Sequence, residues 1–333
     1  MKRLFGILVA GILAVGCGGA AARTSTAARP TGIAHWTALS QVSRPLDLAG
    51  PSRGGSLVLA AAGKLWRLAP SSGRVTRFAP GYQSPGGEEP YIALPAVGHR
   101  GCSFGSNTLY ALRLASGDGV VAISPKGRVR MFATLSARGL IDGIAFDETG
   151  RFGYRLLVTV EHGSTSTLVA IDCHGHLSTI TGRAPKVEGG ITVAPSTFGR
   201  FAGELIASDE NSGRIYAIAP SGRSSLVARS GLPHGGDTGV ESEAFLPAHG
   251  RFEAFLADRG TPGNRHPGDD VVLRVSSAAL FAAGARPGDL LDATEGGAKT
   301  VAVHCGAHAC TVRHVADGPA VAHPEGHIAI LRR

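Results

Sequence analysis

The sequence predicts an all-β protein of the propeller class, in which similar four-stranded antiparallel sheets stand around a central axis. The main observation is a short phrase that recurs about every 50 residues: an apolar strand end, then a turn containing Gly and often Pro or Ser. Its copies lie at 68–74, 123–128, 171–176, 218–223 and, in weaker form, near 275. The composition agrees, because 48 Gly and 19 Pro in a chain of 333 residues supply many tight turns.

The clearest repeat unit spans residues 188–228 and contains four stretches with strand character. The first is short and β-branched, as suits an innermost strand, and the third alternates polar and apolar residues, as a half-buried strand does. Turns rich in Asp, Asn, Ser and Gly separate them. The expected strands are 191–194, 204–208, 214–218 and 224–228. Four antiparallel strands in roughly 40 residues form one propeller blade.

Other segments copy this unit: 143–181 closely, 43–78 and 89–133 more loosely, and 239–275 with three strands that 299–315 completes. The last unit, 317–331, has only two strands, and an open strand edge invites aggregation. Residues 33–39, at the other end of the chain, can complete it. Closing the ring with N- and C-terminal strands gives a six-bladed propeller. The ambiguous insertion at 276–298 leaves five or seven blades as alternatives.

The first residues have the features of an export signal. Lys2 and Arg3 precede an uncharged apolar run at 4–15, which is shorter than the roughly 20-residue helix that crosses a bilayer. The run ends in Ala-Val-Gly-Cys17, which resembles the lipobox of bacterial lipoproteins. The resemblance implies that Cys17 is lipidated and anchors the protein to the extracytoplasmic face of the cell membrane. The alternative is a plain signal peptide that is cleaved nearby.

The chain therefore divides into three parts. We expect a signal peptide at 1–16, a flexible tether at 17–32 and the propeller domain at 33–333. The formal net charge is +8, but Lys and Arg are scattered without a basic run, so nucleic-acid binding is not expected. We expect a monomer whose partner, not identified by the sequence, is a small molecule or another component of the cell envelope.

Four cysteines follow Cys17, and export places them where disulfides persist. Cys305 and Cys310 flank a hairpin-sized loop, which predicts a disulfide between them. The alternative is a zinc or copper site formed with nearby histidines, which are His304, His308 and His314. Pairing of Cys102 with Cys173 across adjacent blades is left open, because spacing alone does not establish geometry.

Three segments resemble known propellers. These are 143–151 (Gly-Ile-Ala-Phe-Asp-Glu-Thr-Gly-Arg), 190–196 and 317–327. They are similar to the six-bladed propellers of the NHL-repeat and gluconolactonase-like superfamily, and the similarity extends over most of 43–331. That superfamily includes lactonases and related hydrolases, sugar dehydrogenases that use a quinone cofactor, and noncatalytic binding scaffolds. The resemblance therefore implies a fold and leaves the function open.

An acidic residue stands just before the expected innermost strand in five units. These residues are Glu89, Asp142, Glu188, Glu241 and Asp317. Innermost strands line the central channel, so we expect the carboxylates to meet near its mouth, where like charges raise one another's pKa. A divalent cation, Ca²⁺ above all, or a channel acid/base pair would use this arrangement. The first unit lacks the acid and offers Arg44 as a counter-charge. The alternative is that each acid caps a turn.

The resemblance gives further candidates. Gluconolactonase-like enzymes hold a metal with a Glu, an Asn and an Asp around the channel. Glu188 matches that Glu, whereas Asn211 matches the Asn poorly. The aromatic residue that usually follows the Glu in those enzymes is missing from this sequence. Polar residues after equivalent strands could share one rim with Arg44. They are Glu161, His162, Asp209, Glu210 and Asp258. Solvated turns explain these rim residues equally well.

These observations support three functional hypotheses. The first is a binding module that takes a ligand or partner at the mouth of its channel. The second is a metal-dependent hydrolase of the lactonase type, with channel carboxylates as metal ligands and base. The third is a quinone-dependent sugar dehydrogenase, suggested only by the resemblance of 161–163 (Glu-His-Gly) to a loop of those enzymes. The Gly-Cys-Ser-Phe-Gly segment at 101–105 fits a serine-hydrolase pattern, but no helix is expected after it, as that motif requires.

Overall fold

A computed structural model describes residues 32–84, 89–96, 100–105, 107–113 and 118–333. The expected signal peptide, the lipidation site Cys17 and nearly all of the tether lie outside these ranges. Within them, helix is confined to α1 (Ser277–Ala282) and the 3₁₀ helix η1 (Gly199–Phe201). None of the helices described is long and apolar enough to cross a membrane.

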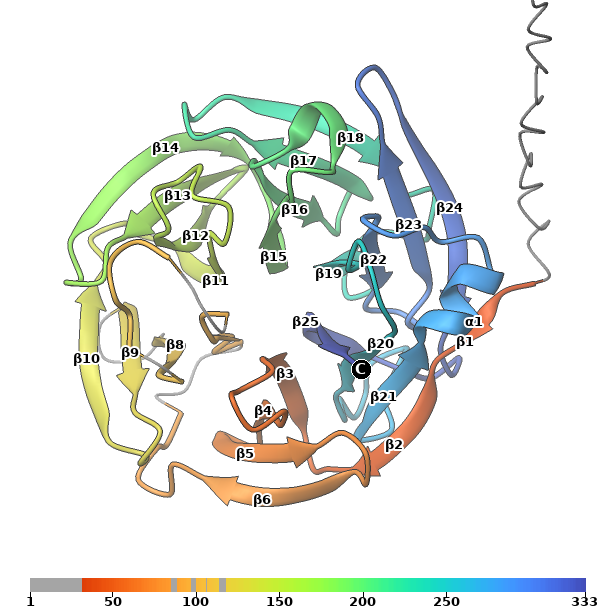
Figure 1. The fold of residues 1–333 in the computed structure, drawn as a ribbon, viewed down its shortest axis with the longest axis horizontal. Helices are drawn as coiled ribbons and strands as arrows, with labels where there is room; N and C mark the ends of the chain where they lie inside the picture. Colours follow the sequence, from red (N-terminus) through yellow and green to blue (C-terminus); the bar gives the residue numbers. More distant parts are fainter. Residues whose placement is uncertain (1–31, 85–88, 97–99, 106, 114–117) are drawn as a thin grey trace, which may run out of the picture.

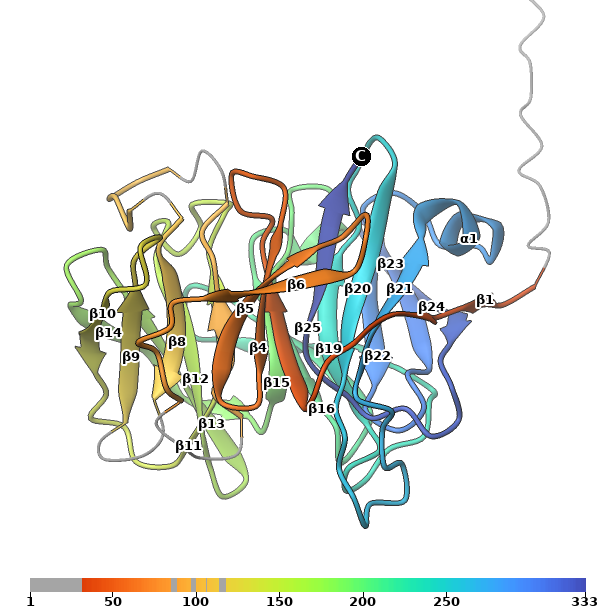
Figure 2. The same ribbon diagram turned by 90° about the horizontal axis from the view of Figure 1, so that it is seen from below.

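The protein is an all-β propeller, as predicted. Its sheets stand around a central axis, seen from one end in Figure 1 and from the side in Figure 2. Three sheets consist of four strands that are consecutive in the sequence. The first holds β3 (Pro45–Ala49), β4 (Leu57–Ala61), β5 (Lys64–Ala69) and β6 (Arg74–Phe78). The second holds β7 (Ile92–Ala93), β8 (Leu109–Arg113), β9 (Gly119–Ile123) and β10 (Val129–Thr134). The third holds β11 (Leu140–Phe146), β12 (Leu156–His162), β13 (Thr165–Ile171) and β14 (Leu177–Pro185).

The next sheet has nine strands and contains two antiparallel groups. One group is β15 (Glu188–Val193), β16 (Leu205–Asp209), β17 (Arg214–Ile218) and β18 (Ser224–Arg229). The other is β19 (Val240–Phe245), β22 (Leu290–Thr294), β23 (Thr300–Cys305) and β24 (Cys310–Asp317), with β1 (Ala34–His35) parallel to β24 at its edge. A single parallel pair, Gly190 with Ser242, joins the two groups.

The last sheet closes the ring with both ends of the chain. Its strand order is β2 (Thr37–Gln41), β21 (Val271–Ser276), β20 (Phe252–Asp258) and β25 (Pro324–Arg332). The N-terminal strand β2 is therefore at one edge and the C-terminal strand β25 at the other. Every strand pair in this sheet is antiparallel. Closure of this kind protects the two strands at the chain ends from lying unpaired.

The assignment of strands around residue 250 differs from the prediction. The sequence groups 239–275 into one unit with three strands, but β19 pairs with β22, and β20 and β21 pair with β25 and β2. The predicted order is wrong here because β20 is almost entirely buried and apolar, so its local pattern fits either sheet. Pairing with the distant β25 decides the outcome, and the insertion at 276–298 supplies α1 and β22.

One strand of each antiparallel group faces the axis. Figure 1 shows β3, β15, β19 and β25 around the centre, and β7 and β11 are the corresponding edge strands of their sheets. These six inner strands are packed by apolar clusters that fill the spaces between neighbouring sheets. In one such space, the rings of Phe104 and Phe146 are 4.9 Å apart and those of Tyr110 and Phe132 are 4.8 Å apart. Tight packing of this kind fixes the inner strands relative to one another.

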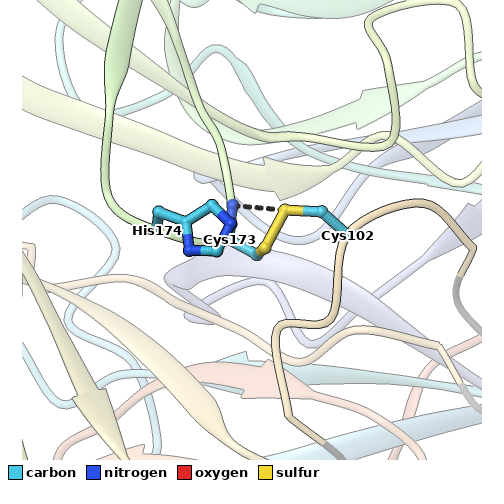
Figure 3. Close-up of side chains that lie close together, drawn as sticks. All are labelled: Cys102, Cys173 and His174. Carbon is cyan, nitrogen blue, oxygen red and sulfur yellow. Dashed lines mark hydrogen bonds between the residues drawn. A yellow bond between two sulfur atoms is a disulfide. The ribbon is translucent and has the colours of Figure 1, made fainter.

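Two disulfides are present. The predicted bridge between Cys305 and Cys310, here called the hairpin disulfide, is confirmed across the β23–β24 hairpin. Oxidised sulfur is a poor metal ligand, so the zinc or copper alternative at these cysteines is wrong. Cys102 and Cys173 also form a bridge, here called the inter-sheet disulfide, which joins the β7–β8 loop to the β13–β14 turn (Figure 3).

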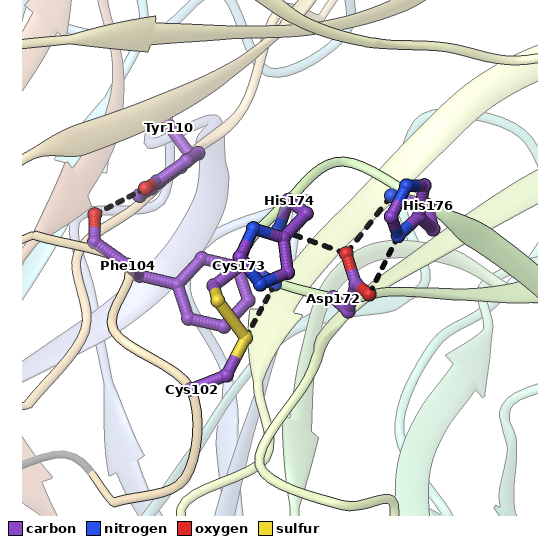
Figure 4. The surroundings of a disulfide bond; sticks show 7 residues. All are labelled: Cys102, Phe104, Tyr110, Asp172, Cys173, His174 and His176. Carbon is purple, nitrogen blue, oxygen red and sulfur yellow. Dashed lines mark hydrogen bonds and ion pairs between the residues drawn. A yellow bond between two sulfur atoms is a disulfide. The ribbon is translucent and has the colours of Figure 1, made fainter.

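The turn that carries Cys173 is itself well ordered by hydrogen bonds. The Asp172 carboxylate accepts hydrogen bonds from the backbone N–H groups of His174 and His176, at 2.8 and 2.9 Å (Figure 4). On the other side, the hydroxyl of Tyr110 donates to the carbonyl of Phe104, close to Cys102 (Figure 4). The inter-sheet disulfide therefore connects segments that belong to two different sheets.

Candidate functional site

Each inner strand has a carboxylate in its first half or just before it. These residues are Asp47 on β3, Glu89 before β7, Asp142 on β11, Glu188 on β15, Glu241 on β19 and Glu325 on β25. We call this end of the channel the acidic mouth. Because the inner strands converge on one axis, one acid from each of six separate chain segments is brought to the same region.

Three of these carboxylates surround the hydroxyl of Tyr91, which is fully buried. The Tyr91 oxygen lies 2.6 Å from Glu89 Oε2, 2.6 Å from Glu241 Oε1 and 3.3 Å from Glu325 Oε2. A phenol has a single proton to donate. Two short contacts to carboxylates therefore require a second proton between Tyr91 and either Glu89 or Glu241, or a cation close by.

Basic side chains partly neutralise this group. Arg259 Nη1 lies 2.8 Å from Glu325 Oε1 and 3.8 Å from Glu89 Oε1. His323 Nε2 lies 3.0 Å from Glu295 Oε1 and 3.4 Å from Glu325 Oε1. Two acids of the mouth, Glu89 and Glu325, and the nearby Glu295 therefore share one guanidinium and one imidazole.

The pKa values follow from burial and from this charge balance. Burial, then repulsion by Glu325, raises the pKa of Glu89 and of Glu241 well above the usual range. Burial also acts on Glu325, but His323 and Arg259 outweigh it and hold the pKa of Glu325 below its usual value. Burial lowers the pKa of His323, but hydrogen bonds to Glu295 and Glu325 outweigh that effect and raise it to about 10. His323, with its pKa of about 10, is thus protonated at neutral pH and Glu325 is ionised, whereas the raised pKa values of Glu89 and Glu241 favour their protonated forms.

A second group of carboxylates lies on the other side of the mouth. One oxygen each of Asp142, Glu161 and Glu188 lies within 4.8 Å of the others. The only described cation in contact is Lys186, whose Nζ lies 3.1 Å from Glu161 Oε1 and 3.6 Å from Glu188 Oε2. Three carboxylates facing one ammonium leave an excess of negative charge.

Asp142 is the most constrained member of this second group. Its side chain is fully buried, and neither oxygen accepts a hydrogen bond of normal geometry from a described residue, although the N–H of Gly189 is close. Burial, then the charges of Glu188 and Glu161, raises the pKa of Asp142 well above its usual range. An unpartnered buried carboxylate is costly, and hard cations with oxygen ligands satisfy such groups. The second group therefore fits a divalent cation.

Glu188, a member of this group, and the neighbouring Glu210 have pKa values close to neutrality. Burial raises the pKa of Glu188 to about 7, with Lys186 opposing the shift and Glu161 adding to it. Burial, then the charge of Glu188, raises the pKa of Glu210 to about 7. A carboxylate with a pKa near 7 can accept and return a proton under physiological conditions.

Two expectations about the mouth are wrong. Asp317 is not at the channel: it ends the outer strand β24, where His314 Nε2 lies 2.8 Å and Lys299 Nζ 3.4 Å from its Oδ1. Glu325, eight residues later, takes the expected position because the inner strand begins at Pro324. Arg44 is exposed: its backbone N–H donates to Asp270 Oδ1 and its carbonyl accepts the Ala62 N–H, but its guanidinium makes no ion pair with a described carboxylate.

The residues proposed for a rim have different surroundings. Glu161 belongs to the second group, and Glu210 is nearly buried beside it. Asp258 is buried and accepts the N–H of His323 at 2.8 Å. His162 is exposed at the end of β12. Asp209 accepts the Asn211 N–H at 3.1 Å and the hydroxyl of Ser212, as the turn interpretation predicts.

Sequence reasoning did not find several residues of the mouth. These are Asp47, Tyr91, Glu295, His323 and Glu325. Asp47 stands inside its strand, where Oδ2 accepts the Ile92 N–H at 2.7 Å and Oδ1 lies 3.0 Å from His327 Nδ1. The repeat could have located Asp47 and Glu325, since both lie in the first half of inner strands.

Comparison with known proteins finds only distant structural similarities. No protein-family model matches the sequence, and no curated protein is significantly similar to it. Similar solved structures include a protein of the gluconolactonase type (14% identity, 68% of this chain and 71% of that chain covered, TM-score 0.41). Another is virginiamycin B lyase from Staphylococcus aureus (13% identity, 82% and 85% covered, TM-score 0.43). A third is the calcium-binding protein regucalcin from Agrobacterium tumefaciens (10% identity, 84% and 79% covered, TM-score 0.46). Likeness at this level carries no argument about activity.

Proposed function

We propose that the protein is a divalent-cation-dependent hydrolase of the lactonase type, with its centre at the acidic mouth. The observation that carries this proposal is the Asp142 carboxylate, which is fully buried and unpartnered beside Glu161 and Glu188. All three belong to the rigid sheets around the channel. In this proposal they hold the cation, with Ca²⁺ the first candidate because every ligand is an oxygen.

The chain's own residues have separate tasks in this proposal. A bound divalent cation supplies Lewis-acid polarisation of a carbonyl group. Lys186 limits the repulsion between the three carboxylates. Glu210, with its pKa of about 7, is positioned to take a proton from water and to return it to the leaving oxygen.

We further propose that the propeller has six blades. In this interpretation the nine-stranded sheet counts as two blades, β15–β18 and β19 with β22–β24, because only one residue pair links them. We also retain the proposal of a lipid anchor at Cys17, which the export features of the sequence suggest. A lipid-anchored enzyme would act on substrates outside the cytoplasm.

Calcium binding is the first test. Protein freed of metal with EDTA is titrated with CaCl₂ in a calorimeter, alongside Asp142→Asn and the control Asp317→Asn, which makes the same change on an outer strand. We expect binding to the wild type and the control, and affinity at least ~10-fold weaker in Asp142→Asn because a ligand charge is lost. At Ca²⁺ 100-fold above Kd the unfolding free energy should rise by about 2.7 kcal/mol. No binding by the wild type would refute the cation centre.

Turnover is the second test. Hydrolysis of a panel of γ- and δ-lactones is followed by acid release in a pH-stat, with and without the cation. We expect cation-dependent turnover that falls about 100-fold in Glu210→Gln while calcium affinity is retained, because general-base catalysis commonly contributes this much. Cation binding without turnover of any lactone would overturn the hydrolase and favour the binding-module hypothesis.

A further inference from the structure

A cavity of about 820 Å³ occupies the channel end opposite the acidic mouth. Every inner strand contributes to it with residues that follow the acid in the sequence. Representative lining residues are Leu48, Ile92, Ile144, Ile191, Leu246 and Ile328. Each of the six segments therefore runs from a carboxylate at one end of the channel into an apolar wall at the other. The two ends have opposite chemistry although the same strands form both.

The cavity has the size and lining of a small-molecule site. Such sites usually measure roughly 300–1,000 Å³ and are mainly apolar with a few polar groups. Leu94, Phe245 and Ile330 line it while remaining partly exposed. Apolar side chains left partly exposed inside a concave wall gain stability when a ligand removes them from water.

His327 separates the cavity from the acidic mouth. It lines the cavity on β25, two residues after Glu325. The imidazole Nδ1 of His327 lies 3.0 and 3.1 Å from the two carboxylate oxygens of Asp47. The backbone N–H of His327 donates a hydrogen bond to Asp47 Oδ1 at 2.8 Å. The imidazole is thus fixed to β3 between the two ends of the channel. A ligand in the cavity would contact this ring and not the carboxylates of the mouth.

The rim of the cavity carries one arginine and one glutamate. Arg332, at the end of β25, is exposed and lines the cavity. Its guanidinium makes no hydrogen bond or ion pair with another described residue. The adjacent Arg333 differs, because it pairs with Glu253. Glu148 also lines the rim, and one of its oxygens accepts the N–H of Ala96 at 2.9 Å. Exposed Ser196 and Thr197 complete the polar edge.

We propose that this cavity is a second binding site, separate from the acidic mouth, for a small amphipathic anion. The apolar body of the ligand would lie against the inner strands, and its carboxylate or sulfonate would face Arg332. Guanidinium groups bind such anions through charge-assisted hydrogen bonds. Aromatic and medium-chain aliphatic acids are the class of compound that combines these features.

The test uses two fluorescent probes that share an apolar body and differ in charge. One is 8-anilinonaphthalene-1-sulfonate and the other is the neutral N-phenyl-1-naphthylamine. We expect both to bind the wild type with one-to-one stoichiometry. Arg332→Gln should lower the affinity for the sulfonate probe about 5-fold, as expected for the loss of one exposed charge contact. The affinity for the neutral probe should be unchanged. Arg333→Gln is the matched control and should change neither.

Variants that fill the cavity with a large side chain test whether the probes bind inside it. Thr192→Trp places a large side chain on β15 at a half-buried lining position and should abolish binding of both probes. Ala248→Trp, in the lining segment after β19, replaces it if the first variant does not fold. Near-ultraviolet circular dichroism verifies that each variant is native. Binding that survives in a folded Trp variant, or equal effects of the two Arg variants, would overturn the proposal.

Discussion

Two buried carboxyls outside the mouth make a prediction that can be worked through in numbers. Glu243 on β19 and Asp292 on β22 are directly opposite each other in the antiparallel pair, and both are essentially inaccessible to solvent. The hydroxyl of Ser208, on β16, donates to Asp292 Oδ2 at 3.0 Å. No described basic side chain pairs with either carboxyl. Burial raises the pKa of Asp292 to about 8, and burial followed by the charge of Asp292 raises that of Glu243 well above its usual range.

The sign of the pH effect follows from these shifts. An unfolded chain releases the Asp292 proton near pH 4, whereas the folded protein keeps it to about pH 8. Between these values the folded state binds more protons, so stability falls as pH rises, by about 1.4 kcal/mol per pH unit for each retained proton. One proton therefore removes at most about 4 kcal/mol between pH 5 and pH 8. Asp292→Asn should flatten the pH dependence by up to this amount.

Urea unfolding at pH 5, 6, 7 and 8, in buffers containing EDTA, measures the effect. The mouth carboxyls titrate in both proteins, so the quantity of interest is the difference between the wild-type and Asp292→Asn slopes. Glu243→Gln should flatten the slope in the same way. Ser208→Ala is the control: it removes a hydrogen bond but no titrating group, so it should lower stability without flattening the slope. Equal slopes for the wild type and Asp292→Asn would refute the reasoning.

Two further predictions concern stability. Removing the inter-sheet disulfide by replacing both cysteines with alanine should cost about 4 kcal/mol, and removing the hairpin disulfide about 2 kcal/mol, because the loops they close span 71 and 5 residues. Guanidinium unfolding of both variants measures these losses. A larger loss of unfolding free energy from removing the hairpin disulfide than from removing the inter-sheet disulfide would contradict the prediction. Gly190→Ala should cost about 1–3 kcal/mol, since its new Cβ would stand 2.6 Å from the Gly326 carbonyl oxygen. Gly54→Ala, which meets no atom within 4 Å, is the control, and equal melting temperatures would disprove the clash.

The candidate site could be predicted only in part. The repeat placed Glu89, Asp142, Glu188 and Glu241 at one position of successive units, and the structure brings them to one mouth. The same logic chose Asp317 for the last unit, because that residue precedes a Pro- and Ala-containing stretch similar to an inner strand. The strand actually begins at Pro324, and its partner is β20 from a distant part of the chain.

The separation of the acids into two groups could not be predicted. It depends on Tyr91, which gathers Glu89, Glu241 and Glu325 around one hydroxyl, and on a register shift in β11 next to Asp142. A shift of one residue moves a side chain to the other face of a strand. Neither the shift nor the converging contacts leave a pattern in the local sequence.

The sequence by itself determined the class of fold, the position of most strands and the hairpin disulfide. These features depend on interactions between residues close in the chain: turn formation by Gly, Pro, Asp and Asn, and alternation of apolar side chains. Only the tertiary structure decided that β20 and β21 complete the sheet of the chain ends, and that Glu325 and Arg259 meet in the channel. Such pairings join segments far apart in the sequence, and they are chosen by packing around a closed ring, which no single segment encodes.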